Sequence, residues 1–332
     1  MNTMIRNIFM AAVCSVVFSG ILAAQELFPS QPQKVKTCVV QPFYAVSAGD
    51  NFEVVLQEGP CSVKLSTDEA LQPYIKVSVR DSILYIDYDE KAVPSDIKRV
   101  YRGVNAPTPI LRADVWAPAL SGIRGLENAV IKGNGTVFSD GMELYLSDKA
   151  AVRDLKLDAD HAKVRMEKNS TAILEILSET QLELSLEDNS QLKLKYKAHN
   201  LLMRETKYAT AFMEGESATA TYSIDGSTRC RDLHKGNVLV VEAGGSADVS
   251  LSGQVGDLTL KMERNAKLDA LEMKTTRVKA DMTGRSTANV DVEEFLSVNL
   301  TGGSALYYKG VPAFQVNKIE KSTLMAYEEK EK

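Results

Sequence analysis

Hydrophobic residues alternate with polar ones along much of the chain, and this alternation sets the first expectation for the fold. A period of two recurs in short runs, as at Leu144 and Leu146 and again at Val164 and Met166. Successive side chains of a β-strand point to opposite faces, so this period indicates strands with one buried face. No ten-residue window combines the i, i+3, i+4, i+7 spacing of an amphipathic helix with a helix cap. The pattern therefore predicts an all-β protein.

The strands recur at a nearly constant spacing. A small residue follows a bend in each repeat, and consecutive markers lie 18 to 21 residues apart. In chain order the markers are Ala129, Ala150, Ser170, Ser190, Ala209 (the weakest match), Ser227, Ser246, Ala266, Ser286 and Ser304. A regular period of this length indicates stacked structural repeats. The residue before the marker is usually Asn or Gly, so we expect one residue with positive φ at this point of each coil.

Strand repeats without intervening helices fit a right-handed parallel β-helix, a single-stranded solenoid with about 20 residues per coil. A leucine-rich horseshoe of similar period would need helical stretches between its strands. About ten coils at roughly 4.8 Å each would form a rod on the order of 45 Å long. We assign residues 116–315 to these regular repeats.

The two ends of the chain depart from the period. Residues 38–115 contain strands and turns without the repeat, and we interpret them as an irregular N-terminal β cap that includes the first coils. A separate small β domain is the alternative. Residues 316–332 follow Gly310 and Pro312, end in a run of Glu and Lys, and are predicted to be a charged tail.

Residues 1–24 have the form of a secretory signal peptide, with Arg6, an apolar run and Ala23-Ala24 at its end. A retained membrane anchor is the alternative. No other stretch approaches the ~20 apolar residues that span a bilayer, so we expect no transmembrane segment in the mature chain. Export would place Cys38 and Cys61 in an oxidising compartment, where a disulfide between them would stabilise the fold by about 3 kcal/mol. Cys230 is expected to be a buried thiol.

Composition narrows the classes of function. The chain has 44 acidic and 39 basic residues and a formal net charge of −5, which argues against nucleic acid as a partner. Only three His, one Trp and 7% aromatic residues are available for acid–base clusters, metal shells or sugar-stacking platforms. The Cys and His residues have no zinc-like spacing, and we expect no metal and no cofactor.

Three phrases of the sequence resemble a known family. They are GDNFEVVL at 49–56, APALSGI at 117–123 and LTGGSALYYKGVP at 300–312. They are similar to the opening strand, the entry to the repeats and the closing phrase of the head GIN domain family of auto-transporter adhesins, over roughly residues 40–315. The bends here are more charged than the Ser-Gly bends of that family. The resemblance implies an exported β-helical protein of the periplasm or cell surface of a Gram-negative, Bacteroides-type bacterium, with no established catalytic residues.

Three functions follow as hypotheses. The first is a non-catalytic binding or adhesion-like protein of the cell envelope that binds a glycan or a cell-surface protein. The second is a polysaccharide-active enzyme, a lyase or glycosidase, which would need carboxylates or a base with cationic partners on one exposed face. The third is a structural spacer or assembly module. The candidate binding or catalytic residues lie in the least regular coil and are Asp225, Arg229, Arg231, Asp232 and His234, although a protruding charged bend explains the same residues. We favour the non-catalytic binder.

Overall fold

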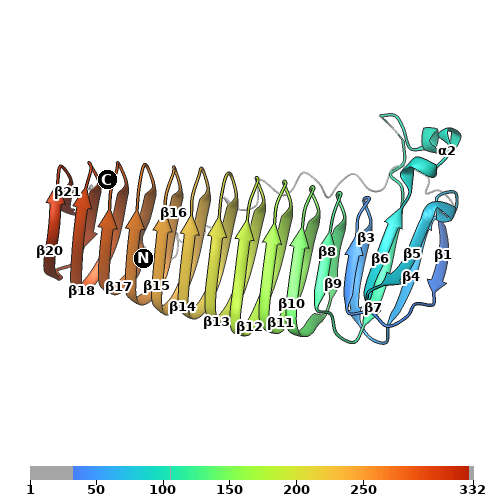
Figure 1. The fold of residues 1–332 in the computed structure, drawn as a ribbon, viewed down its shortest axis with the longest axis horizontal. Coiled ribbons are helices and arrows are strands. Elements are labelled where there is room, and N and C mark those ends of the chain that lie inside the picture. Colours follow the sequence, from blue (N-terminus) through green and yellow to red (C-terminus); the bar gives the residue numbers. More distant parts are fainter. Residues whose placement is uncertain (1–32, 105, 329–332) are drawn as a thin grey trace, which may run out of the picture.

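The computed structural model describes residues 33–104 and 106–328. Strands make up 68% of the structure and helices 4%, in a β-helix of about 11 turns with coils of about 19 residues. In Figure 1 the chain rises along the near side of the rod, returns along the far side and advances by one coil. This path is right-handed, and the expected parallel β-helix is confirmed.

Each central coil is one long strand that bends near its middle, so its two halves lie on opposite sides of the rod (Figure 1). These strands are β10 (Thr136–Leu146), β11 (Ala151–Met166), β12 (Thr171–Leu186), β13 (Gln191–Glu205), β14 (Thr210–Ile224), β15 (Arg229–Ala243), β16 (Asp248–Met262), β17 (Lys267–Met282) and β18 (Thr287–Thr301). Every consecutive pair among them is parallel. We call the halves before and after the bend the first and second sheets.

The core is a set of side-chain columns that run along the rod. In β12, Leu182, Leu184 and Leu186 point inward and are buried, whereas the residues between them are partly exposed. Leu182 stacks on Leu201 of the next coil, and the same register repeats through the rod. Each coil therefore buries only a thin apolar layer, and neighbouring coils must cover it.

The turns between coils explain the sequence marker. In the first four full turns two successive residues have positive φ, as Asp188 (51°) and Asn189 (60°) do, and Ser190 N–H donates to Glu187 O across 3.1 Å. These features fit a type I′ turn. The next five turns have one such residue, and at Lys207, Arg264 and Gly284 it lies one position earlier than expected, whereas the turn before β19 again has two, Gly302 and Gly303. These five turns therefore use a single positive φ, and Tyr208, Asn265 and Arg285 do not adopt the expected conformation.

The N-terminal coils are stacked out of chain order. β2 (Ala45–Ala48) and β3 (Glu53–Glu58) form one coil. β6 (Ile83–Tyr88) and β7 (Leu111–Ala117) pair with its outer side, while β8 (Gly122–Gly125) and β9 (Val130–Asn134) pair with its inner side. The first coil of the chain is therefore the second in space. All of these strands belong to the same continuous β-structure as the rod.

Antiparallel strands and a helical segment close this end. β4 (Ser62–Asp68) pairs antiparallel with β7, β1 (Gln33–Cys38) with β4, and β5 (Ile75–Arg80) with β6. The segment between β6 and β7 contains η2 (Glu90–Ala92) and α2 (Ser95–Val100), and η1 (Gln72–Tyr74) precedes β5. Ile97 and Tyr101 pack against the core, and α2 lies at this end of the rod in Figure 1. The N-terminal end is thus covered.

The C-terminal end continues the β-helix beyond the expected boundary at residue 315. β19 (Ala305–Lys309) and β20 (Ala313–Glu320) both pair with β18, and β21 (Thr323–Ala326) pairs with β19. The segment expected to be a tail therefore begins inside a strand. The charged residues Lys318, Glu320 and Lys321 hide the apolar alternation of this segment in the sequence. They are tolerated because the last coil is exposed.

The expected signal peptide, residues 1–24, lies outside the described residues. Within the described ranges the structure contains no helix long and apolar enough to cross a membrane. Cys38 and Cys61 are half-buried free thiols in this structure, and Cys38 lies opposite Val63 in the antiparallel pair of β1 and β4, only two residues from Cys61. The disulfide between them stays a prediction. Cys230 is buried, as expected.

The disulfide can be tested by counting thiols in protein that has been exported through an oxidising compartment. The chain after residue 24 contains three cysteines. After unfolding without reductant we expect one reactive thiol, that of Cys230, and two reactive thiols in a Cys38→Ser variant. Three thiols in the unfolded wild-type protein would contradict the pairing.

The turn geometry predicts a cost for adding a side chain at Gly245. Its φ is +62°, and an added Cβ would lie 2.7 Å from the backbone nitrogen of Gly226 in the preceding coil. We expect Gly245→Ala to lower the free energy of unfolding by about 1–3 kcal/mol in urea titrations. Gly49→Ala is the matched control, because its Cβ would meet no atom closer than 3.8 Å. Equal effects of the two substitutions would argue against the stacked-turn explanation.

Candidate functional site

The residues that the sequence singled out in β15 divide between the two sides of the sheet. Arg229 and Arg231 point outward and are exposed, whereas Asp232 and His234 point inward and are buried. Arg231 lies over the Phe212 ring at 5.8 Å, and Arg229 lies 3.7 Å from Asp248. Asp225 lies in the preceding turn and contacts Arg264 at 3.3 Å. The five residues therefore do not form one site.

The inward residues instead belong to a polar network in the core. The Tyr196 hydroxyl lies 3.0 Å from Asp232 Oδ2 and 2.7 Å from His234 Nδ1. Tyr222 O–H donates to the same Asp232 oxygen. We call these four residues the buried tyrosine network. They come from three successive coils, β13, β14 and β15.

One proton arrangement satisfies the short contacts of the network. Both tyrosine hydroxyls donate to Asp232, and His234 Nδ1–H donates to the Tyr196 oxygen. In this arrangement His234 is a neutral imidazole with its proton on Nδ1. Burial lowers the pKa of His234 to about 4 and raises the pKa of Asp232 to about 6, while the hydroxyls of Tyr222 and Tyr196 oppose the rise. A neutral imidazole and a carboxylate that accepts two hydroxyls are therefore the forms expected near pH 7.

A second buried carboxyl group lies nearby without any such partner. Glu205 is fully buried, and neither of its oxygens has a hydrogen-bond partner among the described residues. It occupies an inward column between Leu186 and Ile224. Burial raises its pKa to about 8, so the carboxyl group is expected to be largely protonated at neutral pH. Glu205 was not among the residues predicted from the sequence, although it continues the period-two series of Leu201 and Met203 and could have been recognised as an inward-facing acid.

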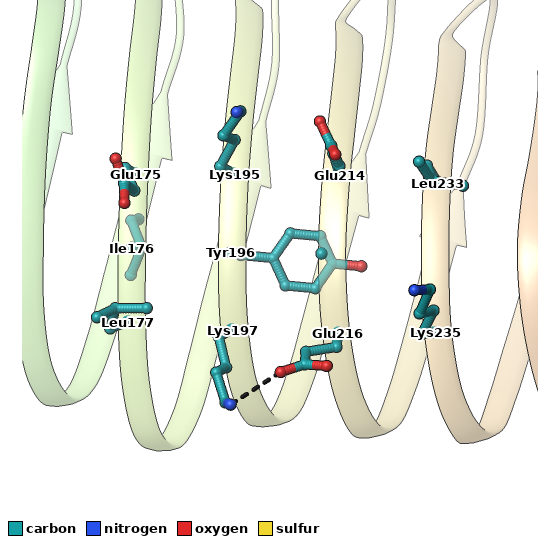
Figure 2. Close-up of a pocket in the computed structure, with 11 residues that line it drawn as sticks. Glu175, Ile176, Leu177, Lys195, Tyr196, Lys197, Glu214, Glu216, Leu233 and Lys235 are labelled. Carbon is teal, nitrogen blue, oxygen red and sulfur yellow. Dashed lines mark ion pairs between the residues drawn. The ribbon is translucent and has the colours of Figure 1, made fainter.

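Glycine makes room for the network. Tyr196 and His234 are neighbours in one inward column, separated by Gly215 of β14. An added Cβ at Gly215 would lie 2.7 Å from Cγ of the Tyr196 ring. Figure 2 shows this ring crossing β14 toward β15. A side chain at position 215 would therefore displace Tyr196 from its two partners.

A shallow depression of about 330 Å³ lies outside the network on the first sheet (Figure 2). Its rim consists of charged residues of alternating sign in neighbouring strands, among them Lys197, Glu216 and Lys235. Lys197 pairs with Glu216 at 2.9 Å. Asp232 and His234 are enclosed beneath the depression, so neither of them reaches its surface.

A larger groove of about 670 Å³ crosses the second sheet near the N-terminal end. Its floor lies where Ala45 of β2 pairs with Gly122 of β8, and these small residues separate Ile83 of β6 from Glu143 of β10. The span from β6 to β10 is three strand spacings, or about 14 Å. We call this feature the β2–β8 groove. It exists because two coils with small outward residues lie between coils with large ones.

The edges of the β2–β8 groove combine aromatic rings with guanidinium groups. Arg124, Tyr145 and Arg165 lie side by side in successive strands. Tyr145 O–H donates to Glu167 at 2.6 Å and Arg165 donates to the same carboxylate at 3.2 Å, so both side chains are held in place. Arg124 has no hydrogen bond or ion pair with another described residue. Its guanidinium therefore keeps its donors available to a ligand.

The open corner of the groove adds further polar groups. Tyr44 is more than half exposed and contributes an aromatic ring, and Ser82, Ser121 and Asp81 line the same corner. The backbone fixes this corner, because Ser121 N–H donates to Tyr44 O at 2.7 Å and Tyr44 N–H donates to Ser82 O at 2.9 Å. Across the described ranges no three His, Cys, Asp or Glu side chains are grouped in a way that could hold a metal ion.

With the fold and these sites in place, comparison with known proteins assigns the family. The chain belongs to the family described as "putative auto-transporter adhesin, head GIN domain", whose model matches residues 42–176 and 232–312. The resemblance of the three sequence phrases is thereby confirmed. No curated protein matches the chain.

Solved structures of low sequence identity are also similar. A putative adhesin of Parabacteroides merdae is 15% identical, with 89% of this chain and 96% of that chain covered and a TM-score of 0.31. A putative adhesin of Bacteroides fragilis is 13% identical, with 90% and 99% covered and a TM-score of 0.30. One from Parabacteroides distasonis is 14% identical, with 90% and 98% covered and a TM-score of 0.34.

The family match separates the two sites. The β2–β8 groove lies wholly within the matched residues 42–176. Tyr196, Glu205 and Tyr222 lie in residues 177–231, which the family model does not match, and Asp232 is the first residue after that gap. The buried tyrosine network therefore belongs to coils in which this chain departs from the family pattern.

Glu205 predicts a pH dependence of stability. Its folded pKa is raised to about 8, so its contribution to stability is present below the unfolded pKa and is lost as pH rises toward 8. The loss over the whole range from about pH 4.5 to above pH 8 is about 5 kcal/mol, of which about 1 kcal/mol falls between pH 7 and 8, where the folded protein keeps Asp232 largely ionised and His234 neutral. We expect urea unfolding to reveal this loss in the wild-type protein and a flatter profile for Glu205→Leu.

The matched control for this experiment is Glu179→Gln, because Glu179 is exposed on the bend of β12. Its profile should follow the wild type. A Glu205→Leu variant that is less stable than the wild type at pH 8, or that keeps the wild-type slope, would contradict the assignment of a protonated, unpartnered Glu205.

Proposed function

We propose that the protein is a non-catalytic, adhesion-like binding protein that is exported to the cell envelope and binds a glycan chain in the β2–β8 groove. Membership of an adhesin family supports the adhesion-like class. The observation that carries the proposal is the groove itself, which places Tyr44, Arg124 and Tyr145 along one open channel of about 670 Å³.

The chemistry of the groove favours a sugar ligand. Aromatic rings offer an apolar face with a polar edge, which suits the C–H face and hydroxyl groups of a pyranose ring. Arg124 and Arg165 supply planar sets of N–H donors that pair with hydroxyl or carboxylate oxygens, and Asp81 and Glu143 supply acceptors. A channel that crosses several neighbouring strands accommodates an extended chain better than a compact ligand. A cell-surface protein is the other partner class, and the binding assay can separate the two.

The location of the titratable residues favours binding over catalysis. A glycosidase or lyase needs its carboxylates or base within reach of the glycosidic bond or the abstracted proton. Asp232 and His234 are 2% and 0% exposed, with Tyr196 between them and the surface depression. In the β2–β8 groove the two carboxylates, Asp81 and Glu143, come from the turn before β6 and from β10.

Binding can be tested on a panel of immobilised neutral and acidic glycans with the wild-type protein and two variants, Tyr44→Ala and Arg124→Ala. We expect each substitution to weaken binding by roughly tenfold or more, which corresponds to about 1.4 kcal/mol. The matched control is Tyr208→Ala, because Tyr208 is 65% exposed in a turn far from the groove. Control binding should equal that of the wild type.

The same panel should be incubated with the protein and analysed for released or shortened sugars. Turnover that is lost in an Asp232→Asn or His234→Gln variant would overturn the non-catalytic proposal. Glycan binding that Tyr44→Ala and Arg124→Ala leave unchanged would place the ligand elsewhere on the rod.

A further inference from the structure

The two ends of the rod differ in whether the core and the strand edges are covered. At the N-terminal end antiparallel strands and the segment that contains α2 cover the core. At the C-terminal end β20 pairs only with β18 and β21 pairs only with β19 among the described strands. One edge of each terminal strand therefore has unpaired backbone N–H and C=O groups, which is the feature that leads sheets to associate.

The last coil also exposes the side chains that continue the apolar core. Phe314, Val316 and Ile319 lie in the columns of Leu296, Val298 and Leu300. The three residues of β18 are each 0% exposed, whereas those of β20 are 46%, 54% and 42% exposed. The side chains point in the same inward direction, but among the described residues no further coil lies on β20.

We propose that this C-terminal end binds the same end of a second copy of the chain and forms a two-fold symmetric, end-to-end dimer. A two-fold axis perpendicular to the two sheets would bring β20 antiparallel to its own copy and β21 antiparallel to its own copy. Such an interface is isologous, so each surface is its own partner and the assembly closes at two subunits. It would satisfy both free edges and cover the exposed core residues together.

The register of β20 favours this self-pairing. A bulge interrupts its pairing with β18, and Asn317 is the extra residue between Val316 and Lys318. Antiparallel pairing centred between Val316 and Asn317 places the two bulges opposite each other. It also places Phe314 of one copy opposite Ile319 of the other, so apolar side chains of the core columns meet.

The charges of the terminal coil point the same way. Lys318 and Glu320, which pair with each other at 2.7 Å, occupy one half of β20, and the other half, Ala313–Val316, is uncharged. Self-pairing sets each charged half against an uncharged half. Head-to-tail stacking would instead set β20 against β5 of the second sheet, which carries Lys76 and Arg80. It would also meet an end at which the core is already covered.

The dimer can be tested by sedimentation velocity of the full chain over the micromolar range. We expect the wild-type protein to have the mass of a dimer and Val316→Lys to have about half that mass, with unchanged far-UV circular dichroism. Phe138→Lys is the matched control, because Phe138 is 51% exposed on the side of the rod in β10. It should remain dimeric. A wild-type protein that is monomeric at all concentrations would overturn the proposal.

A cysteine variant distinguishes the two-fold arrangement from other assemblies. The interface brings position 316 of one copy close to position 316 of the other, so Val316→Cys should form a disulfide-linked dimer under mild oxidation that the wild-type protein does not form. Mass that grows beyond two subunits, or an absence of cross-linked dimer in a dimeric variant, would contradict the two-fold contact. Because the β2–β8 groove lies at the other end of the rod, these results are independent of the glycan-binding assay.

Discussion

The stacking of one coil on the next is the constraint on which the structure depends. Each coil donates and accepts backbone hydrogen bonds along nearly its whole length, and each inward side chain lies on the equivalent side chain of its neighbour. A single coil has almost no core of its own, because it contributes one layer of side chains between two sheets. Stability is therefore shared between neighbours, and any residue that cannot be stacked affects at least three coils.

Because of this stacking, a polar residue in the core needs a polar partner within the stacked columns. In the coils β13 to β15 the columns contain Tyr196, Glu205 and Asp232 where other coils have Leu, Ile or Met. The two tyrosines, Asp232 and His234 largely satisfy one another, whereas Glu205 finds no partner and is expected to avoid its charge by holding a proton. A polar residue in such a column can be paired only by an inward residue of a neighbouring coil or by one two positions away in its own strand, since the directly flanking side chains point outward.

The same constraint locates the surfaces available for binding. Most of each sheet is a flat lattice of paired charges, such as Lys156 with Glu175 and Lys261 with Glu242. A groove forms only where small outward residues coincide in adjacent coils, as at Ala45 and Gly122. The apolar core columns become exposed where stacking stops, as at β20. Recognition by a β-helix of this kind therefore depends on local departures from the repeat.

The sequence by itself determined the all-β class, the coil period and the inward columns, because alternation and small turn residues are local consequences of strand geometry. It also indicated the family, through the phrases that open and close the repeats. It did not determine that residues 313–326 form a further coil or that Asp232 and His234 are enclosed. Nor did it determine the order of the N-terminal coils, in which β2 lies between β6 and β8. Those features depend on which strands become neighbours, and a strand carries the same alternation whichever neighbour it meets. Only the tertiary structure brings Ala45 beside Gly122, or Tyr196 within reach of His234, because hydrogen-bonded stacking fixes contacts between residues that are distant in the chain.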